Sequence, residues 1–490
     1  MKITDKTALA ALEPAEVMRW FLKLTEIPRP SNHEEKIAGW LCDFAKARGL
    51  DVYTDETRNV FMKKPGQCGG EKAGTVLLQG HTDMVCEKNR DVTLDFFKDP
   101  LRVYAEDGKL RAEGTTLGGD DGVAVACMLA LLDSKDIPHP PLECLFTAAE
   151  ETGLDGATGF DASRITARKM INMDSESLHE IVSGCAGGVR TDLTFRTRAF
   201  FLTKEDTGLE VSVLGLAGGH SGENIADGIP NANKVMGRLL CALWDRMPFR
   251  MYTLCGGAKD NAIPRECTAG IALTRKRKAE AVKFLTKTFE TIRSEWPDRH
   301  KGARLEIRDT VPLRAWNELF TCKIIRLLGT VDNGVFEMHR SIPGLVGWSR
   351  NLGVIQTLRT SLRFVFSTRS DRPSQIDASC TELSGLGEIY GAEVKHYARY
   401  PGWIHREDSA LRELWMQTFR DKTGEDMRNL VIHAGLECGI LSEKCPQLDI
   451  ISVGPDLSGI HSPDEALDIA SLGVFWNVLL AVLDKLCKKQ

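Results

Sequence analysis

The hydrophobic residues between positions 11 and 44 recur at helical spacing in two blocks. Pro14 stands where a first helix would begin, and the segment 27–31, which contains two prolines, interrupts the pattern. Ser31 followed by Glu34 has the spacing of a capping box, so a second helix is predicted to start there. The N-terminal part of the chain is therefore expected to be helical.

From residue 52 onward, apolar strands alternate with a helix. Continuous apolar runs bounded by turn residues predict buried strands, and a longer apolar block after a glycine-rich turn predicts a helix. The predicted strands cover 52–62 (two strands), 75–85, 140–149 and 171–174, and the helix covers 123–132. This order is typical of an α/β domain, in which parallel strands end at one edge of the sheet.

The pattern changes again at about Val189. Alternating apolar and polar residues, for example at 208–213 and 269–273, predict half-buried antiparallel strands packed with helices, which is an α+β module. Near the C-terminus, a helix at 409–419 and an apolar strand at 448–454 resume the first pattern. At 490 residues the chain is too long for one hydrophobic core, so at least two domains are expected.

The predicted strand at 75–85 carries His81 and Asp83 close to its end. Residues two apart in an extended chain point to the same side, so Asp83 could hydrogen-bond the imidazole and fix its tautomer for a metal ion. A turn with a capping aspartate explains the same residues without a metal. The pair becomes informative only if similar residues stand at the ends of other strands.

Acidic residues stand after the next elements in the same way. Asp120 and Asp121 close a glycine-rich turn before the helix at 123–132, where they could cap that helix or bind a cation. Glu150 and Glu151 come directly after a strand; as neighbours they cannot point the same way, so one can bind metal while the other handles a proton. Asp174 ends a further short strand.

Histidines and polar loops in the second half extend this set. His461 comes after a strand end and a glycine loop, as His81 does. The loop 218–222 presents His220, and the loop 256–265 presents Asn261 and Arg265. Both loops could be ordinary surface connections, but their donors suit an oxyanion or a carboxylate.

The composition argues against several classes of function. A formal net charge of −5, from 63 basic and 68 acidic residues, leaves no broad basic field for nucleic acid. The 14 cysteines show no framework spacing, and no signal peptide is recognised, so a reducing cytoplasm is expected. No apolar run is judged long enough for a membrane span, so no membrane partner is expected.

These motifs, in this order, resemble the aminoacyl-histidine dipeptidases, cytosolic peptidases of the dinuclear zinc peptidase superfamily that includes aminoacylase and carnosinase. The matching segments are 27–31, 80–85, 115–122, 150–153, 172–174, 219–222, 261–265, 433–438 and 460–463. The resemblance implies an α/β catalytic domain with a mixed, largely parallel sheet, interrupted by an inserted α+β lid domain. The expected boundaries are 1–187 and 399–490 for the catalytic domain and 188–398 for the lid and dimerisation domain.

The same resemblance implies a ligand set for two divalent metal ions. Asp120 would bridge them, with His81 and Asp174 completing one site and Glu151 and His461 the other. Zinc is expected, with manganese or cobalt as alternatives. Two ions about 3.5–4 Å apart can share a hydroxide and polarise the scissile carbonyl.

The remaining roles are implied in the same way. Glu150 would be the general base and Asp83 the residue that orients His81. His220 would stabilise the oxyanion, and Asn261, Arg265 and His433 would hold the ends of the substrate. The chain departs from the family pattern at Asp121, where many relatives carry Asn, and at 348–350, so its side-chain preference could differ.

The function expected from these residues is hydrolysis of short peptides, Xaa-His-type dipeptides among them, by a homodimer that binds a small peptide. An N-acyl-amino-acid deacylase with the same site is the alternative within the superfamily. A peptide-binding scaffold that has lost the chemistry is the alternative of another class, because a fold by itself does not guarantee activity. Against the scaffold stands the presence of every expected ligand together with Glu150.

Overall fold

The computed structural model describes residues 2–296, 302–340 and 342–488 and divides into two compact units. The first unit comprises the described residues of 1–185, 403–431 and 436–490, and the second comprises those of 186–402 and 432–435. The stretch 432–435, which was expected to belong to the catalytic segment 399–490, thus belongs to the second unit. His433 consequently belongs to the second unit.

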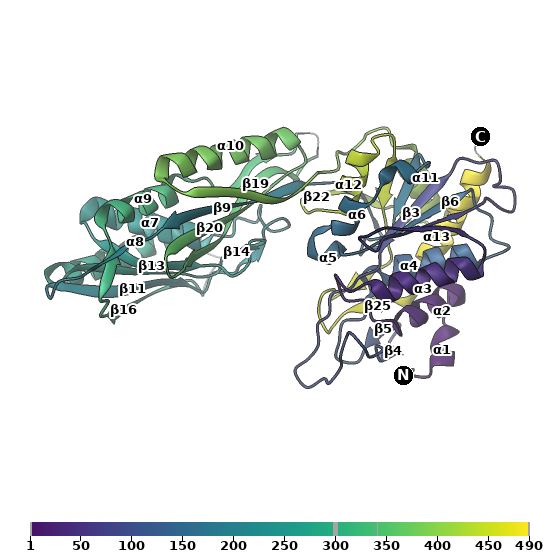
Figure 1. Ribbon diagram of the computed structural model, residues 1–490, viewed down its shortest axis with the longest axis horizontal. Helices are drawn as coiled ribbons and strands as arrows, with labels where there is room; N and C mark the ends of the chain where they lie inside the picture. The colour runs from purple at the N-terminus through teal and green to yellow at the C-terminus, as the bar shows by residue number, and fades with distance from the viewer. Residues whose placement is uncertain (1, 297–301, 341, 489–490) are drawn as a thin grey trace. The chain divides into compact units, whose positions relative to one another are not determined.

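The first unit is built on an eight-stranded mixed sheet (Figure 1). Its strands, in spatial order, are β1 (Asp51–Thr54), β2 (Val60–Lys64), β6 (Leu142–Thr147), β3 (Val76–His81), β7 (Lys169–Asn172), β23 (Asp449–Ser452), β8 (Glu180–Cys185) and β22 (Arg428–Ile432). The four central strands β6, β3, β7 and β23 are mutually parallel, while β2 pairs antiparallel with both β1 and β6. The expected mixed, largely parallel sheet is thus present at the centre.

Helix α4 (Gly119–Asp133) packs against strand β3 at the middle of this unit. It has no polar face, and its residues from Gly122 to Leu132 are all buried. A helix that is apolar on every side has to lie inside the protein. Gly80 permits the close approach, because a Cβ there would lie 2.4 Å from the Ala124 Cβ and 2.4 Å from Asp121 Oδ2.

The other helices of the first unit surround the sheet and α4. They are α1 (Lys6–Ala10), α2 (Ala15–Leu24), α3 (Glu35–Ala47), α5 (Glu150–Gly153), α6 (Asp155–Gly159), α11 (Ala410–Thr423), α12 (Glu437–Lys444) and α13 (Ile469–Lys488), with a 3-10 turn, η1, at Ala162–Arg164. A small antiparallel sheet of β24 (Leu457–Ser458), β25 (Ala466–Asp468), β5 (Lys109–Ala112) and β4 (Val103–Glu106) completes the unit.

Helix α13 corrects the expectation that no apolar segment reaches the length of a membrane span. Among the described residues it alone is long and apolar enough, with a mean hydropathy of 1.6. Its residues Leu472, Phe475, Leu479 and Val482 belong to the core of the first unit, and the Trp476 indole donates to Glu16 Oε1 at 2.7 Å. These contacts are those of the core helix of a globular domain.

The predicted capping box before α3 is also corrected. Glu34 itself precedes the helix without a side-chain cap, and its Oε1 accepts hydrogen bonds from the amides of Asn32 at 2.7 Å and Ala149 at 3.0 Å. Ala149 has a φ of 51°, in the left-handed region that non-glycine residues rarely adopt. Glu34 therefore stabilises the turn that leads from β6 into Glu150, rather than the helix end.

The second unit is built on an antiparallel nine-stranded sheet, teal to green in Figure 1. Its strands, in spatial order, are β16 (Arg304–Thr310), β11 (Asp206–Leu214), β15 (Cys267–Thr274), β13 (Arg250–Gly256), β19 (Val346–Thr357), β20 (Ser361–Ser370), β9 (Gly187–Arg196) and β21 (Glu393–Tyr400), with β18 (Gly334–Met338) beside β19. Two strand pairs stand apart: β10 (Ala199–Phe201) with β17 (Arg314–Trp316), and β12 (Gly219–His220) with β14 (Ala262–Ile263).

Four helices pack on this sheet and form a second hydrophobic core with it. They are α7 (Ala232–Arg246), α8 (Lys278–Arg293), α9 (Glu318–Thr330) and α10 (Pro373–Tyr390), with a short 3-10 turn, η2, at Arg275–Arg277. Leu193 and Phe364 from the sheet and Leu239 and Leu328 from the helices are fully buried in this core. The second unit is therefore an α+β module with its own interior, as the alternating pattern predicted.

Candidate metal centre

The parallel strands of the first unit deliver its candidate ligands to one edge of the sheet. Strand β3 ends at His81, β6 is followed by Glu150 and Glu151 in α5, and β7 is followed by Asp174. The carboxyl ends of parallel strands form the place where ligands bind in open α/β sheets. Asp120 reaches the same place from the start of α4, where its backbone is not yet helical.

Asp120 lies between two imidazoles. Its Oδ1 is 2.9 Å from His81 Nε2, and its Oδ2 is 3.1 Å from His461 Nε2. The two oxygens of one carboxylate thus serve different histidines, which come from opposite ends of the chain. This arrangement is compatible with a carboxylate that is shared by two ions.

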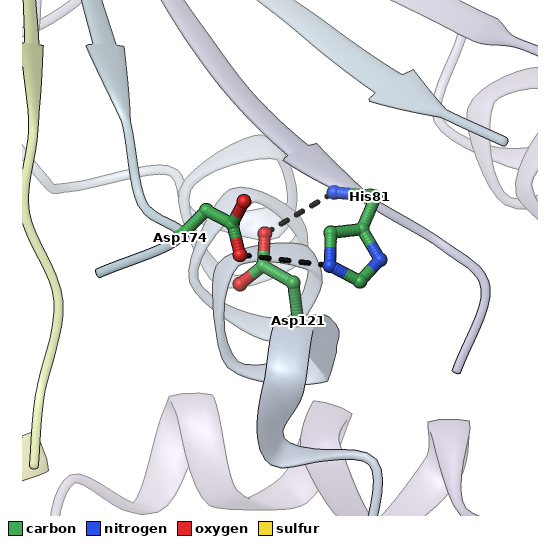
Figure 2. Close-up of side chains that lie close together, drawn as sticks. All are labelled: His81, Asp121 and Asp174. Carbon is green, nitrogen blue, oxygen red and sulfur yellow. Dashed lines mark hydrogen bonds and ion pairs between the residues drawn. The ribbon is translucent and has the colours of Figure 1, made fainter. Parts of the chain in front are cut away.

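One group of ligands gathers around His81 (Figure 2). Asp174 Oδ1 lies 3.5 Å from His81 Nε2, and the Asp121 carboxylate lies beside them. Asp121 Oδ2 accepts from the backbone amide of His81 at 3.1 Å, and its Oδ1 accepts from the Ala124 amide at 3.4 Å. Asp121 therefore caps α4, one of the two roles the sequence left open, and at the same time holds the end of β3.

A second group contains Asp120, Glu151 and His461, whose ligand atoms lie within 4.8 Å of one another. His461 Nε2 is 3.0 Å from Glu151 Oε2 in addition to its contact with Asp120. The His461 side chain is 46% exposed, whereas that of His81 is almost fully buried. Asp120 belongs to the second group and contacts His81 of the first through its other oxygen, and the histidines of the two groups differ in their access to solvent.

Asp83 contacts both His81 and the start of α5. Its backbone oxygen is 3.2 Å and its Oδ1 is 3.5 Å from His81 Nδ1. The same carboxylate accepts from the amides of Glu150 at 3.1 Å and Glu151 at 3.3 Å. Asp83 thus faces the imidazole as expected, and it also fixes the backbone of both glutamates, a contact that the sequence did not indicate.

The charges of this cluster are strongly coupled. Burial opposes protonation of His81, but the Asp174 charge and hydrogen bonds to Asp120 and Asp174 raise its pKa well above the usual value. Hydrogen bonds to Asp120 and Glu151 raise the pKa of His461 to about 10. Burial acts to raise the pKa of Asp120, but the two imidazoles outweigh it and hold that pKa far below its usual range.

The other acids respond to burial in the opposite direction. Burial raises the pKa of Asp174 to about 6, against the attraction of His81. Burial also raises the pKa of Glu150 and of Asp121 well above the usual values, and the Asp174 charge adds to both shifts. Burial and neighbouring negative charges favour the protonated form of such carboxyl groups, and a nearby cation favours the ionised form.

The donor set fits two divalent cations. The described part of the chain contains three groups of His, Asp and Glu residues, and within each group the ligand atoms lie within 4.8 Å of one another. Together the groups contain His81, Asp120, Asp121, Glu150, Glu151, Asp174 and His461. Imidazole nitrogen and carboxylate oxygen are ligands of zinc, and carboxylate oxygen also suits manganese. An excess of buried acids over bases is what bound cations would neutralise. The geometry supports a dinuclear centre with Asp120 in the shared position.

A hydrogen-bonded network that the sequence analysis missed lies next to the centre. Glu437 Oε2 accepts from Gln79 Nε2 at 2.6 Å and from Thr147 Oγ1 at 2.7 Å, and Gln79 Oε1 accepts from Asn172 at 2.7 Å. All four side chains are fully buried, and burial raises the pKa of Glu437 to about 7. Each of these polar residues stands two or three positions before a candidate site residue: Gln79 before His81, Thr147 before Glu150, and Asn172 before Asp174. This spacing was the only feature of the sequence that could have indicated the network.

The candidate substrate residues all lie in the second unit. His220 pairs with Ala262 between β12 and β14, and the backbone oxygen of Asn261 accepts from the Ser221 amide at 2.8 Å. His433 Nε2 lies 2.7 Å from Ser349 Oγ, which gives the unusual segment 348–350 a role in orienting that ring. Arg265 is exposed, with its stem against Gly218.

Arg369, which the sequence analysis did not single out, joins this group. It is buried on β20, and its Nη1 donates to Tyr400 Oη at 2.9 Å. Burial together with the positive charges of Arg369 and His220 lowers the pKa of His433 to about 3. The Arg369 charge also lowers the pKa of His220, after burial, so Arg369 is the cationic member of this group and favours the neutral form of both imidazoles.

The fold and the donor set point to one class of protein, hydrolases with groups that could hold divalent ions at the strand ends of an α/β domain. Residues 77–485 match Peptidase family M20/M25/M40. The chain belongs to this peptidase family. The resemblance on which the sequence analysis relied is thereby confirmed, together with the α/β fold class and the assignment as a peptidase.

Individual relatives agree with this assignment. The chain is 35% identical to the cytosol non-specific dipeptidase of Escherichia coli (strain K12) over 486 residues, which are 98% of this chain and 99% of that protein. The crystal structure of the aminoacylhistidine dipeptidase from Vibrio alginolyticus superposes with a TM-score of 0.89 at 34% identity, covering 97% and 98% of the two chains. An M20 metallo-carboxypeptidase from Sulfolobus solfataricus shares the fold, with a TM-score of 0.53 at 15% identity, 97% of this chain and 100% of that chain being covered.

Proposed function

We propose that this peptidase is a metal-dependent dipeptidase that hydrolyses short peptides with a free amine and a free carboxylate, Xaa-His-type dipeptides among them. The observation that carries the proposal is the position of Asp120, whose two oxygens face His81 and His461 at 2.9 and 3.1 Å. Two full-length relatives with 34–35% identity are named as dipeptidases, which supports the substrate class.

In the proposed mechanism, His81 and Asp174 would hold one ion, Glu151 and His461 would hold the other, and Asp120 would be a ligand of both. When bound, the two ions, zinc in our proposal, activate a water molecule and polarise the scissile carbonyl. The Glu150 carboxylate takes a proton from the attacking water and passes it to the nitrogen of the leaving amine. Asp83 keeps Glu150 in place because it accepts the hydrogen bonds of the Glu150 and Glu151 amides.

The second unit, which we propose as the lid, supplies residues for substrate recognition. A planar guanidinium is the side chain best suited to a carboxylate, and Arg369 has one N–H group, at Nε, without a partner. We therefore assign the C-terminal carboxylate of the peptide to Arg369 and His433. His220 would stabilise the oxyanion, with Asn261 and Arg265 as further contacts to the substrate.

A substrate panel tests the proposed function. Purified protein, supplied in turn with zinc, manganese and cobalt, should cleave free dipeptides, including Xaa-His, faster than tripeptides, N-acyl amino acids or dipeptide amides. The reason is that the proposed contact with Arg369 and His433 requires a free carboxylate on the residue that follows the scissile bond. Preference for N-acyl amino acids would instead assign the chain as a deacylase, and absence of any metal-dependent hydrolysis would assign it as a binding scaffold.

The same panel applied to Arg369→Met examines the carboxylate assignment. The variant should lose roughly tenfold or more in kcat/KM for the free dipeptide, mainly through KM, because a charge-assisted hydrogen bond contributes about 1.5–3 kcal/mol. The dipeptide amide should be affected much less. Arg363→Met, on the same strand but paired with Asp192 at 2.7 Å, is the matched control. An equal loss for both substrates would contradict the assignment.

We propose a homodimer that assembles through the second unit. Around β10 and β17 the side chains of Val311, Leu313, Phe201 and Leu319 are 89%, 76%, 69% and 69% exposed. Leu202 and Leu313 are joined by a backbone hydrogen bond of 3.0 Å, which brings the segments beside β10 and β17 together, and we propose that their exposed apolar residues form one patch. Apolar patches that are rimmed by polar residues are typical of protein interfaces, and in a chain of this family a second copy is the simplest occupant.

Light scattering tests the dimer. The wild-type protein should have about twice the chain mass of 54.2 kDa, and Leu313→Glu should shift it towards one chain mass, because a charge at the centre of an apolar interface has no partner. Leu358→Glu, at an exposed leucine outside the patch, should leave the mass unchanged. A wild-type protein that is monomeric at micromolar concentration would refute the proposal.

We propose the cytoplasm as the location. All 14 cysteines, which lie among the described residues, are free thiols, including the exposed Cys68 and Cys255. Free exposed thiols persist in a reducing compartment. The Escherichia coli relative is named as a cytosol enzyme, which supports the same location.

A further inference from the structure

The loop that presents Asp120 is held by one buried carboxylate. Glu465 Oε2 accepts from the amides of Leu117 at 2.7 Å and Gly118 at 3.0 Å, and its Oε1 accepts from the amides of Gly119 at 2.7 Å and Asp120 at 3.3 Å. Four consecutive backbone donors thus converge on a single side chain. Glu465 is only 2% exposed, so water does not compete for these bonds.

The same loop is held from its other side by Arg29. The guanidinium Nη2 donates to the Gly118 oxygen at 2.6 Å, and Nη1 donates to the oxygens of Thr82 at 3.0 Å and Asp83 at 3.1 Å. Arg29 is 2% exposed. It therefore ties the Asp120 loop to the chain that leaves strand β3 just after His81.

Glu465 makes the corresponding link to the other imidazole. It lies four residues after His461, and the segment between them is short and hydrogen-bonded, with the Glu465 amide donating to the Ser462 oxygen at 3.1 Å. The contact with the loop is close: a Cβ on Gly119 would lie 3.2 Å from Glu465 Oε1 and 2.8 Å from Leu457 Cδ2. The position of His461 is thus coupled to that of Asp120 through one carboxylate.

We propose that Glu465 is a positioning residue that sets the distance between Asp120 and His461, while Arg29 fixes the same loop relative to His81. The inference rests on the proposed metal centre. A shared carboxylate can serve two ions only if its backbone is held relative to both histidines. Side chains of this kind, which orient a ligand without touching the ion, commonly change metal affinity or activity by about 10–100-fold when altered.

The test compares Glu465→Gln, Glu465→Asp and Asp464→Asn in metal-free protein reconstituted with cobalt(II). Gln keeps the volume but points an amide NH2 at two backbone donors, and Asp keeps the charge but is one methylene shorter. Asp464 is exposed and its side chain touches none of the loop amides, so Asp464→Asn is the matched control for charge. Cobalt(II) is chosen because its visible absorption reports ligand geometry directly.

We expect both Glu465 variants to bind one cobalt ion as the wild type does and the second about tenfold or more weakly, with an altered visible spectrum. kcat should fall while KM for a dipeptide stays within about twofold. Glu465→Asp keeps the buried charge, so it provides the folded variant if Glu465→Gln fails to fold, which circular dichroism of the metal-free proteins will show.

Two results would overturn the inference. One is wild-type affinity for both ions with an unchanged cobalt spectrum in a folded Glu465 variant. The other is a loss of thermal stability in the metal-free state without any change in cobalt binding, which is what a merely structural residue would give. Failure of the proposed metal centre is recognised separately, because the wild-type protein would then bind fewer than two ions.

Discussion

Glu150→Gln should reduce kcat for dipeptide hydrolysis by about 10²–10⁴-fold while the protein keeps its metal. The amide has nearly the shape of the carboxylate but cannot accept a proton, so the transfer from water to the leaving amine loses its carrier. The Glu150 backbone contact with Asp83, at 3.1 Å, does not involve the side chain and should survive the change. Steady-state kinetics together with elemental analysis of the same sample measure both effects.

The control for this substitution is Glu56→Gln, an isosteric change at an exposed glutamate of the first unit. It should leave both kcat and metal content unchanged. If Glu150→Gln loses metal in proportion to its activity, Glu150 is a ligand rather than a base. That result would be consistent with its presence, beside His81 and Glu151, in one of the three groups of ligand atoms.

Asp120→Ala should abolish detectable turnover and leave less than one tightly bound ion per chain. His81 loses its nearest carboxylate oxygen, at 2.9 Å, and His461 loses one of its two carboxylate contacts, at 3.1 Å, so neither proposed metal site keeps all of its ligands. In the wild type, an ion at a hundred times its Kd should stabilise the fold by about 2.7 kcal/mol. Thermal unfolding with and without zinc should show this gain in the wild type and not in the variant.

Asp43→Ala serves as the control, because that carboxylate is 81% exposed and has only a 3.8 Å contact with Lys46. It should retain two ions and full activity. A variant of Asp120 that still binds two ions would show that the carboxylate is not shared. The dinuclear centre would then have to be rebuilt around Asp121 and Glu150, which also lie near His81.

The strand-end residues show what a local pattern can predict. His81, Glu150, Glu151 and Asp174 each stand after an apolar run, and parallel strands must bring such residues to one edge. The sequence therefore placed these residues correctly at the ends of their strands, while their roles at a metal centre stay a prediction. No local pattern showed that Asp120 lies between His81 and His461, which are 39 and 341 positions away from it. Only the family resemblance implied that arrangement.

The supporting residues were invisible for a different reason. Arg29 and Glu465 act on backbone oxygens and amides, which every residue possesses, so no partner side chain marks their role in the sequence. Glu34 has the spacing of a capping box, yet its carboxylate binds the Ala149 amide from another element. Short spacing rules consider only nearby partners, and tertiary contacts override them.

Taken alone, the sequence determined the α/β class, the inserted α+β module and the residues able to bind metal, because these depend on the spacing of apolar residues and the chemistry of side chains. Only the tertiary structure showed which buried groups hold the loop that presents Asp120, and that Arg369 joins His220 and His433. The physical reason is that burial and long-range hydrogen bonds set the charge and position of each group. Asp120 faces both histidines from a short loop, and Glu465 and Arg29 hold the backbone of that loop.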